Sequence, residues 1–263
     1  MSGEREKLTN MFSKIMAGTV TREEGTMLIN HLAKEDITST VMELAYLIEN
    51  PPPGVFAKTI LHTIALSRNK AFHNLIVNGL EHKNEDVSIL AAQELARLKT
   101  ADAKNVLVEH LGSDVYHVRK VSAAALVQGF GEGVDIVAGR LEGHKEEFYR
   151  STYAQTLLGA GKKGMDALLR VMSSRSHGAV LSAARAVLSA AYKLTEEDIP
   201  KVFEALMVAG DNNDAEAIVE ILKIVAHLRG RASAYDGYVR AFLDSGTSSV
   251  RTEAKAALAA LGS

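Results

Sequence analysis

A spacing of 31 residues recurs through the middle of the chain and constrains its fold more than any other feature. Leucines keep this step from residue 95 to residue 188, and two further positions repeat in the same register. The positions are Leu95, Leu126, Leu157 and Leu188; Ala92, Ala123 and Ala154; and Val87, Val118, Tyr149 and Val180. Several positions that share one period are the signature of a repeat protein, in which similar units stack.

Each unit is expected to be a hairpin of two helices. A first apolar helix ends about 15 residues before the repeat leucine, for example at Leu111, and a polar turn at residues 112–114 follows it. Alanines in the second helix let neighbouring helices approach closely, and leucines at helical spacing fill the shared core. One hairpin cannot bury both of its faces, so the units must stack. The predicted fold class is therefore all-α, an α-solenoid of stacked helical hairpins.

One nine-residue segment identifies the type of repeat. Residues 118–126 read Val-Arg-Lys-Val-Ser-Ala-Ala-Ala-Leu, and residues 250–258 read Val-Arg-Thr-Glu-Ala-Lys-Ala-Ala-Leu. This pattern resembles the HEAT-repeat family, and its short unit resembles the HEAT-like repeats first named for phycobilisome lyases. The resemblance covers residues 74–192 and 235–263, and it is looser at 200–230 because the register shifts there. It implies a HEAT-like superhelix whose second helices line an inner, concave face.

The first 73 residues are helical but only weakly repetitive. Thr21 and Glu24 have the spacing of a capping box, and prolines at residues 51–53 separate helices expected at 37–49 and 55–67. We expect residues 1–73 to form an N-terminal cap with degenerate repeats. Residues 74–263 are expected to form about six hairpins in one continuous solenoid.

Composition excludes several classes of site. The chain contains no cysteine, which removes disulfides, thiolate metal sites and cysteine nucleophiles. The formal net charge is -2 and is evenly spread, so no general affinity for nucleic acid or anionic lipid is expected. No signal core is apparent, and the most apolar stretch, residues 179–192, is too short to span a bilayer and carries Arg185. The expectation is a cytoplasmic protein with no membrane segment.

Three catalytic classes use similar scaffolds, and none of them fits the residues well. Deoxyhypusine hydroxylase takes its iron ligands from His-Glu pairs, and the chain has no His-Glu dipeptide. Alkylpurine DNA glycosylases use tryptophans in their groove; the chain has none, although Tyr149 and Tyr153 could offer an aromatic pair to a stacked base if they are not core residues. The resemblance to phycobilin lyases is one of architecture and transfers no activity. We therefore predict no catalytic residue, no cofactor, no metal ligand and no enzyme activity.

The expected function is that of a protein-binding scaffold or adaptor, with a protein or peptide as its partner. Candidate partner-surface residues are Lys120, Tyr149, Arg150, Tyr153, Lys162, Lys163, Arg185 and Lys223. Arg119 and Arg251 occupy the Val-Arg position of the family, where a structural role is the commoner one. The alternative function is nucleic-acid binding, with a DNA-glycosylase-like protein as one form of it. A continuous positive groove favours nucleic acid, whereas mixed or apolar patches favour protein.

Overall fold

A computed structural model describes residues 3–262 of the chain, and every regular element in that range is helical. The all-α, stacked-hairpin fold class is confirmed. The helices divide into two compact units that meet between residues 125 and 126, within helix α8. In the stretch that the structure covers, no helix is long and apolar enough to cross a membrane.

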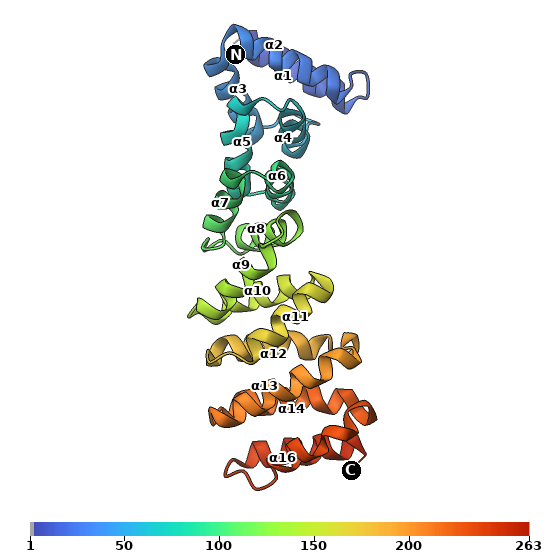
Figure 1. Cartoon of the computed structure of the whole chain (residues 1–263). Helices are drawn as coiled ribbons and strands as arrows, with labels where there is room; N and C mark the ends of the chain where they lie inside the picture. The colour runs from blue at the N-terminus through green and yellow to red at the C-terminus, as the bar shows by residue number, and fades with distance from the viewer. Residues whose placement is uncertain (1–2, 263) are drawn as a thin grey trace. The chain divides into compact units, whose positions relative to one another are not determined.

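The first unit is a stack of short hairpins, in which the second helices α2, α4 and α6 contact one another in turn (Figure 1). The elements are α1 (Gly3–Met16), α2 (Arg22–Glu35), α3 (Ile37–Glu49), α4 (Ala57–Leu66), η1 (Lys70–Phe72), α5 (His73–Asn78), η2 (Gly79–Glu81), α6 (Glu85–Leu98), α7 (Ala101–His110) and the start of α8 (Tyr116–Gly129). Helix α3 has the predicted bounds, and α4 lies within the second predicted range. The predicted capping box at Thr21 and Glu24 is present at the start of α2.

The second unit stacks in the same way, with α10, α12, α14 and α16 forming one row and α9, α11 and α13 another (Figure 1). After the end of α8 its elements are α9 (Gly133–Gly143), α10 (Glu147–Leu158), α11 (Gly161–Met172), α12 (His177–Ser189), η3 (Ala191–Lys193), η4 (Glu196–Asp198), α13 (Ile199–Asp211), α14 (Ala215–Leu228), η5 (Arg229–Tyr235), α15 (Asp236–Arg240) and α16 (Ser248–Leu261). The boundary expected at residue 73 and the single continuous solenoid remain predictions.

The repeat register forms the core of each unit. Leu95, Leu126 and Leu157 are 0% exposed, and the register alanines and β-branched residues are buried beside them. Leu188 is only half-buried, and Val187 takes its place in the core. The change coincides with the end of α12 at Ser189, where the chain leaves the 31-residue register.

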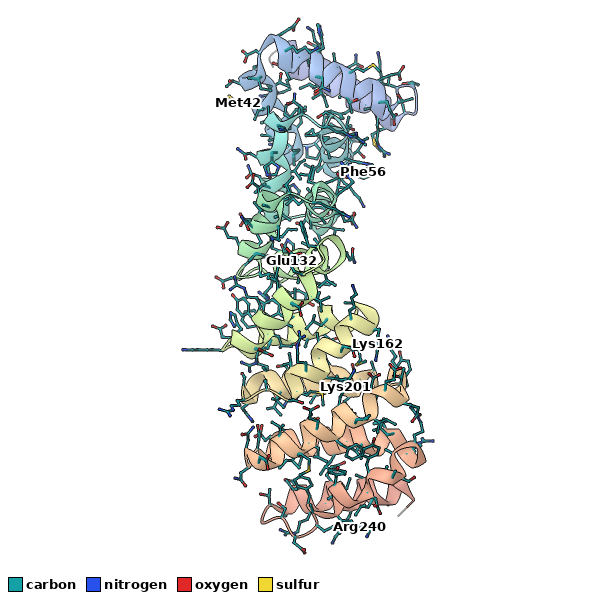
Figure 2. The ribbon with its side chains drawn as sticks, in the orientation of Figure 1. Met42, Phe56, Glu132, Lys162, Lys201 and Arg240 are labelled. Carbon is teal, nitrogen blue, oxygen red and sulfur yellow. The ribbon has the colours of Figure 1, made fainter. Side chains whose placement is uncertain are left out.

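The residues that break the register build a charged link between helices. They form η3 and η4, and η4 ends at Asp198, whose side chain is 1% exposed. Lys162 at the start of α11 donates to Asp198 over 2.5 Å, and Lys201 on α13 lies 2.6 Å from Asp166 and 3.5 Å from Asp198. Lys162 and Lys201 are both labelled in Figure 2. Two lysines and two aspartates thus join α11 to α13.

The pKa of Asp198 reflects its contacts in this link. Burial raises the pKa of Asp198, but hydrogen bonds from Lys162 and from the backbone and hydroxyl of Thr195 outweigh burial and lower the pKa to about 2. A hydrogen bond from Lys201 lowers the pKa of Asp166, and the hydrogen bonds to Asp198 and Asp166 raise the pKa of Lys162 and Lys201 respectively. A carboxyl whose folded pKa is depressed stabilises the fold above its unfolded pKa of about 4 and ceases to do so as the pH falls toward 2.

Replacing Asp198 with Asn should therefore lower the free energy of unfolding by about 2 kcal/mol at pH 7. The loss arises because two ammonium groups keep their positions while their buried anion is removed. Urea denaturation followed by circular dichroism measures it. At pH 2.5 the difference between wild type and variant should fall below about half of its value at pH 7, because the carboxyl of the unfolded chain is then protonated while that of the folded chain, with its pKa of about 2, is still partly ionised.

An exposed ion pair of the same unit provides the control. Arg170 lies 2.8 Å from Asp135, with both side chains more than half exposed. Asp135→Asn should change the unfolding free energy by no more than about 0.5 kcal/mol, because water screens the pair. Equal losses in the two variants would contradict the structural importance of the buried link.

Candidate functional site

The two tyrosines predicted for the partner surface belong to the core. Tyr149 and Tyr153 of α10 are 4% and 0% exposed. The His144 ring stacks on Tyr149 at a centroid distance of 4.0 Å and meets Tyr153 edge-on. The surface prediction is wrong for both residues, because positions i and i+4 of α10 face the neighbouring helices and leave no ring face for a base.

Arg150 holds a turn, so the surface prediction is corrected here as well. One of its terminal nitrogens donates to the carbonyl of His144 at 3.0 Å and to that of Lys145. Arg119 donates to the Ser113 carbonyl at 2.6 Å and Arg251 to the Ser245 carbonyl at 2.5 Å, in both cases six residues back along the chain. These arginines therefore fix the turn between the two helices of their hairpins, as expected for the Val-Arg position.

Most of the other predicted basic residues lie beside carboxylates. Lys120 is 3.8 Å from Glu85, Lys162 is 2.5 Å from Asp198, Arg185 is 2.6 Å from Glu147 and Lys223 is 3.0 Å from Glu220. Lys163 is exposed and forms no ion pair with any residue between 3 and 262. Local pairing neutralises these cations, so they do not form a positive stripe within either unit.

A groove of about 410 Å³ crosses the second helices of the C-terminal unit. Three stacked second helices supply its lining: Leu181 and Arg185 come from α12; Ala215, Glu216, Val219 and Glu220 from α14; and Ser249 from α16, together with Thr247, the N-cap of α16. The stacking of α12, α14 and α16 places these side chains in one row. Of the predicted surface residues, only Arg185 lines the groove, while Lys223 pairs with its wall residue Glu220.

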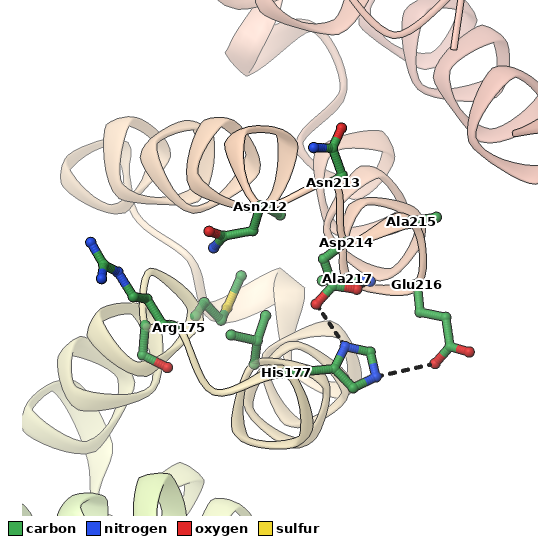
Figure 3. Close-up of a pocket in the computed structure, with 12 residues that line it drawn as sticks. Arg175, His177, Asn212, Asn213, Asp214, Ala215, Glu216 and Ala217 are labelled. Carbon is green, nitrogen blue, oxygen red and sulfur yellow. Dashed lines mark hydrogen bonds and ion pairs between the residues drawn. The ribbon is translucent and has the colours of Figure 1, made fainter. Parts of the chain in front are cut away.

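A second depression of about 490 Å³ adjoins the groove and shares Ala215 and Glu216 with it. It lies between the hairpin turns that precede α12 and α14 (Figure 3). Further residues that line it are Met172, Ser174, Arg175, His177, Val180, Ala209, Asn212, Asn213, Asp214 and Ala217. Asn213 adopts a left-handed backbone with φ 52°, which allows the tight turn between α13 and α14.

A histidine between two carboxylates links this depression to the groove. His177 Nδ1 is 2.6 Å from Asp214 Oδ2, and Nε2 is 3.7 Å from Glu216 Oε2 (Figure 3). The other oxygen of Asp214 accepts a hydrogen bond from the backbone of Ala217 at 3.1 Å and caps α14. Asp214 is thereby fixed, and His177 connects adjacent hairpins through both of its ring nitrogens.

The site combines aliphatic surface with an excess of negative charge. Arg185 is paired with Glu147 and Glu220 with Lys223, so Glu216 supplies the excess negative charge of the groove. Leu181, Ala215 and Val219 supply the apolar part. Such a surface can bind aliphatic side chains together with lysine or arginine, and it repels phosphate. In residues 3–262, no cluster of three or more His, Asp or Glu side chains is placed to hold a metal ion.

The acidic residues of the site did not emerge from the sequence. Glu216 and Glu220 are four residues apart on α14, a spacing that places them on one face of a helix. This spacing can be read from the sequence. The alignment of α14 against α12 and α16 cannot, because the 31-residue register ends before α14.

Residues 41–127 match the family model described as HEAT repeats. Residues 41–127 therefore consist of HEAT repeats. The match covers a third of the chain and begins within the region expected to be a degenerate cap. It does not identify the short repeats of the phycobilisome-lyase type, which remain a prediction.

Solved structures similar to this chain have low identity. An engineered protein is 21% identical with a TM-score of 0.40, covering 98% of this chain and 78% of its own. A designed armadillo repeat protein is 17% identical with a TM-score of 0.36, covering 71% of this chain and 98% of its own. Human deoxyhypusine hydroxylase in complex with glycerol is 13% identical with a TM-score of 0.39, covering 98% and 97%. No curated protein matches the chain.

The guanidinium of Arg150 packs directly against a glycine of the next hairpin. A Cβ atom at Gly178 would lie 2.5 Å from the guanidinium carbon of Arg150. Gly178→Ala should displace Arg150 from its two carbonyl acceptors and lower the free energy of unfolding by about 1–2 kcal/mol. Thermal unfolding followed by circular dichroism measures the change.

Gly139 in the middle of α9 is the matched control, because a Cβ atom there meets nothing within 4 Å. Gly139→Ala should raise stability by about 0.5–1 kcal/mol through helix propensity. In an Arg150→Met background the penalty of Gly178→Ala should largely disappear. A penalty that persists in that background would show that Arg150 is not its cause.

Proposed function

We propose that this chain is a protein-binding scaffold that holds an extended polypeptide segment in the groove across α12, α14 and α16. The observation that carries the proposal is the composition of the groove, in which aliphatic residues alternate with Glu216 and Glu220. A segment with aliphatic and basic side chains complements this surface in both shape and charge. Three stacked helices present one continuous row, which suits a partner that lies across several repeats.

Electrostatics favour a protein partner over nucleic acid. Binding to a phosphate backbone requires several uncompensated Lys or Arg side chains along one path. Here Arg185 is paired with Glu147, Lys223 with Glu220 and Lys162 with Asp198. The buried Tyr149 and Tyr153 cannot stack on a base. Nucleic-acid binding, including a glycosylase-like function, is thus the weaker proposal.

We also propose that the scaffold is non-catalytic. His177 is the natural candidate for a general base at this site, but both of its ring nitrogens face carboxylates, and Asp214 itself caps α14. This arrangement commits the imidazole to joining two hairpins, and it directs neither nitrogen at a bound molecule. A cytoplasmic location belongs to the same proposal, and a chain without cysteine suits a reducing compartment.

Two substitutions on one face of α14 test the groove. Glu216→Lys with Val219→Lys reverses the charge of the groove and removes part of its apolar wall. Tagged wild-type and variant protein are used to purify partners from native lysate, with and without nuclease, and recovery is quantified by mass spectrometry. The variant should recover the wild-type partners at least about tenfold less well, because like charges then meet across the interface.

The control carries the same changes at the same spacing on α13, as Glu204→Lys with Met207→Lys. Glu204 is exposed and Met207 is half-buried, as are Glu216 and Val219 respectively. This control should recover partners as the wild type does. Loss of all partners on nuclease treatment, together with recovery of nucleic acid, would refute the proposal in favour of the nucleic-acid alternative. Equal recovery by wild type and α14 variant would exclude this groove.

A further inference from the structure

The N-terminal unit contains a second site, of opposite charge, in a cavity of about 720 Å³. It lies where two consecutive hairpins join, between the turn that follows α4 and the turn that follows α6. Four basic residues line it, Arg68, Lys70, His73 and Arg97. The volume is within the range of binding pockets and can hold several side chains of a ligand.

The positive charge of this cavity is only partly compensated. Arg97 binds Glu94 at 2.6 Å, and Glu94 is itself 8% exposed, so that pair is internally satisfied. Arg68 and Lys70 are exposed and form no ion pair with any described residue. The remaining acid, Asp102, lies in the first turn of α7, where the helix dipole stabilises it. The cavity therefore has basic side chains available for an anionic group.

The turn that presents Arg68 and Lys70 is fixed by hydrogen bonds. Asn69 Oδ1 accepts from the backbone of Ala71 at 3.0 Å, and Asn69 Nδ2 donates to Asn30 Oδ1 at 3.3 Å. Asn30 Nδ2 in turn donates to the Ser67 carbonyl at 3.4 Å. The backbone on both sides of Arg68 is thereby anchored to α2, so the two basic side chains project from an ordered platform.

The remaining walls select the type of anion. Ile64, Ala65 and Ile76 are buried beneath the rim, and Leu98 is 41% exposed at its edge. Among the described residues that line the cavity there is no Phe, Tyr or Trp, the side chains on which nucleotide bases stack best. Aliphatic walls under a basic rim fit a carboxylate side chain next to an aliphatic one.

We propose that this cavity binds an acidic peptide segment, in which Asp or Glu contacts Arg68 and Lys70 while an adjacent Leu, Ile or Val packs on Ile76 and Leu98. The site differs in residues and in charge from the groove across α12, α14 and α16, and it does not depend on that groove. The chain then has two peptide sites with opposite charge preference.

The backbone supplies a test variant that keeps the fold. Arg68 has φ 52°, and Lys99, one repeat later, has φ 53°. Gly161, three repeats after Arg68 in the same register, has φ 68°. Glycine accepts this left-handed conformation without strain, so Arg68→Gly removes the guanidinium and preserves the turn. Lys99→Gly is the matched control, because Lys99 does not line the cavity.

The experiment is selection from a phage-displayed random peptide library on immobilised full-length protein, followed by sequencing. Wild type should enrich peptides in which Asp or Glu neighbours an aliphatic residue. Arg68→Gly with Lys70→Gln should reduce that enrichment at least about tenfold, since two charge-assisted contacts are lost. Lys99→Gly should retain it, and so should Glu216→Lys with Val219→Lys, which separates this site from the groove in the C-terminal unit. Thermal unfolding confirms that the variants are folded.

The affinity of a synthetic peptide from the enriched class is then measured at a series of salt concentrations. Its affinity for wild type should fall about fivefold or more between 50 and 300 mM salt, because screening weakens exposed charge pairs. Enrichment that is unchanged in the Arg68→Gly and Lys70→Gln variant overturns the proposal, and so does the absence of any acidic class. Binding of single-stranded DNA that depends on Arg68 and Lys70 would also overturn it, because the recognised group is then a phosphate.

Discussion

Every part of this structure depends on one constraint: a two-helix hairpin cannot bury its apolar surface except against the next hairpin. Leu95 on α6 and Leu157 on α10 are fully buried because each helix packs both on the first helix of its own hairpin and on the second helix of an adjacent hairpin. The same constraint explains the polar contacts. Arg119, Arg150 and Arg251 bind turn carbonyls within their hairpins, whereas the Lys162–Asp198 and His177–Asp214 pairs cross from one hairpin to the next.

Many charged side chains form ion pairs between neighbouring repeats. The number of basic residues is therefore a poor guide to the binding surfaces of such a chain. An ion pair between stacked hairpins separates its partners by about one repeat along the sequence. Lys162 and Asp198, Arg170 and Asp135, Lys201 and Asp166, and Arg231 and Glu196 are all 35 or 36 residues apart. A cation compensated in this way contributes little to a binding field. Sites are therefore more informative where the compensation is incomplete, as at Arg68 and Lys70 in one cavity and at Glu216 in the groove.

The sequence predicted the fold because the repeat register directly reports which residues are buried. The same reasoning misplaced the candidate site. Tyr149 stands at a register position shared with Val87 and Val118, and that alignment already indicated a core residue. Arg150 follows Tyr149 as Arg119 follows Val118, so its structural role could also have been inferred. The acidic groove could not, because Glu216 and Glu220 lie beyond the point at which the register breaks, and their alignment with α12 and α16 depends on η3 and η4.

The break in the register connects the buried link to the groove. The residues that form η3 and η4 lengthen one repeat, and a longer repeat moves the next second helix relative to its predecessor. Asp198 compensates for the insertion by tying η4 to α11, so α13 and α14 keep their stacking despite the extra residues. The groove requires that stacking, since Leu181, Val219 and Ser249 come from three different helices. A substitution at Asp198, outside the groove, is thus expected to affect partner binding through the placement of α14, whereas one at Asp135 is not.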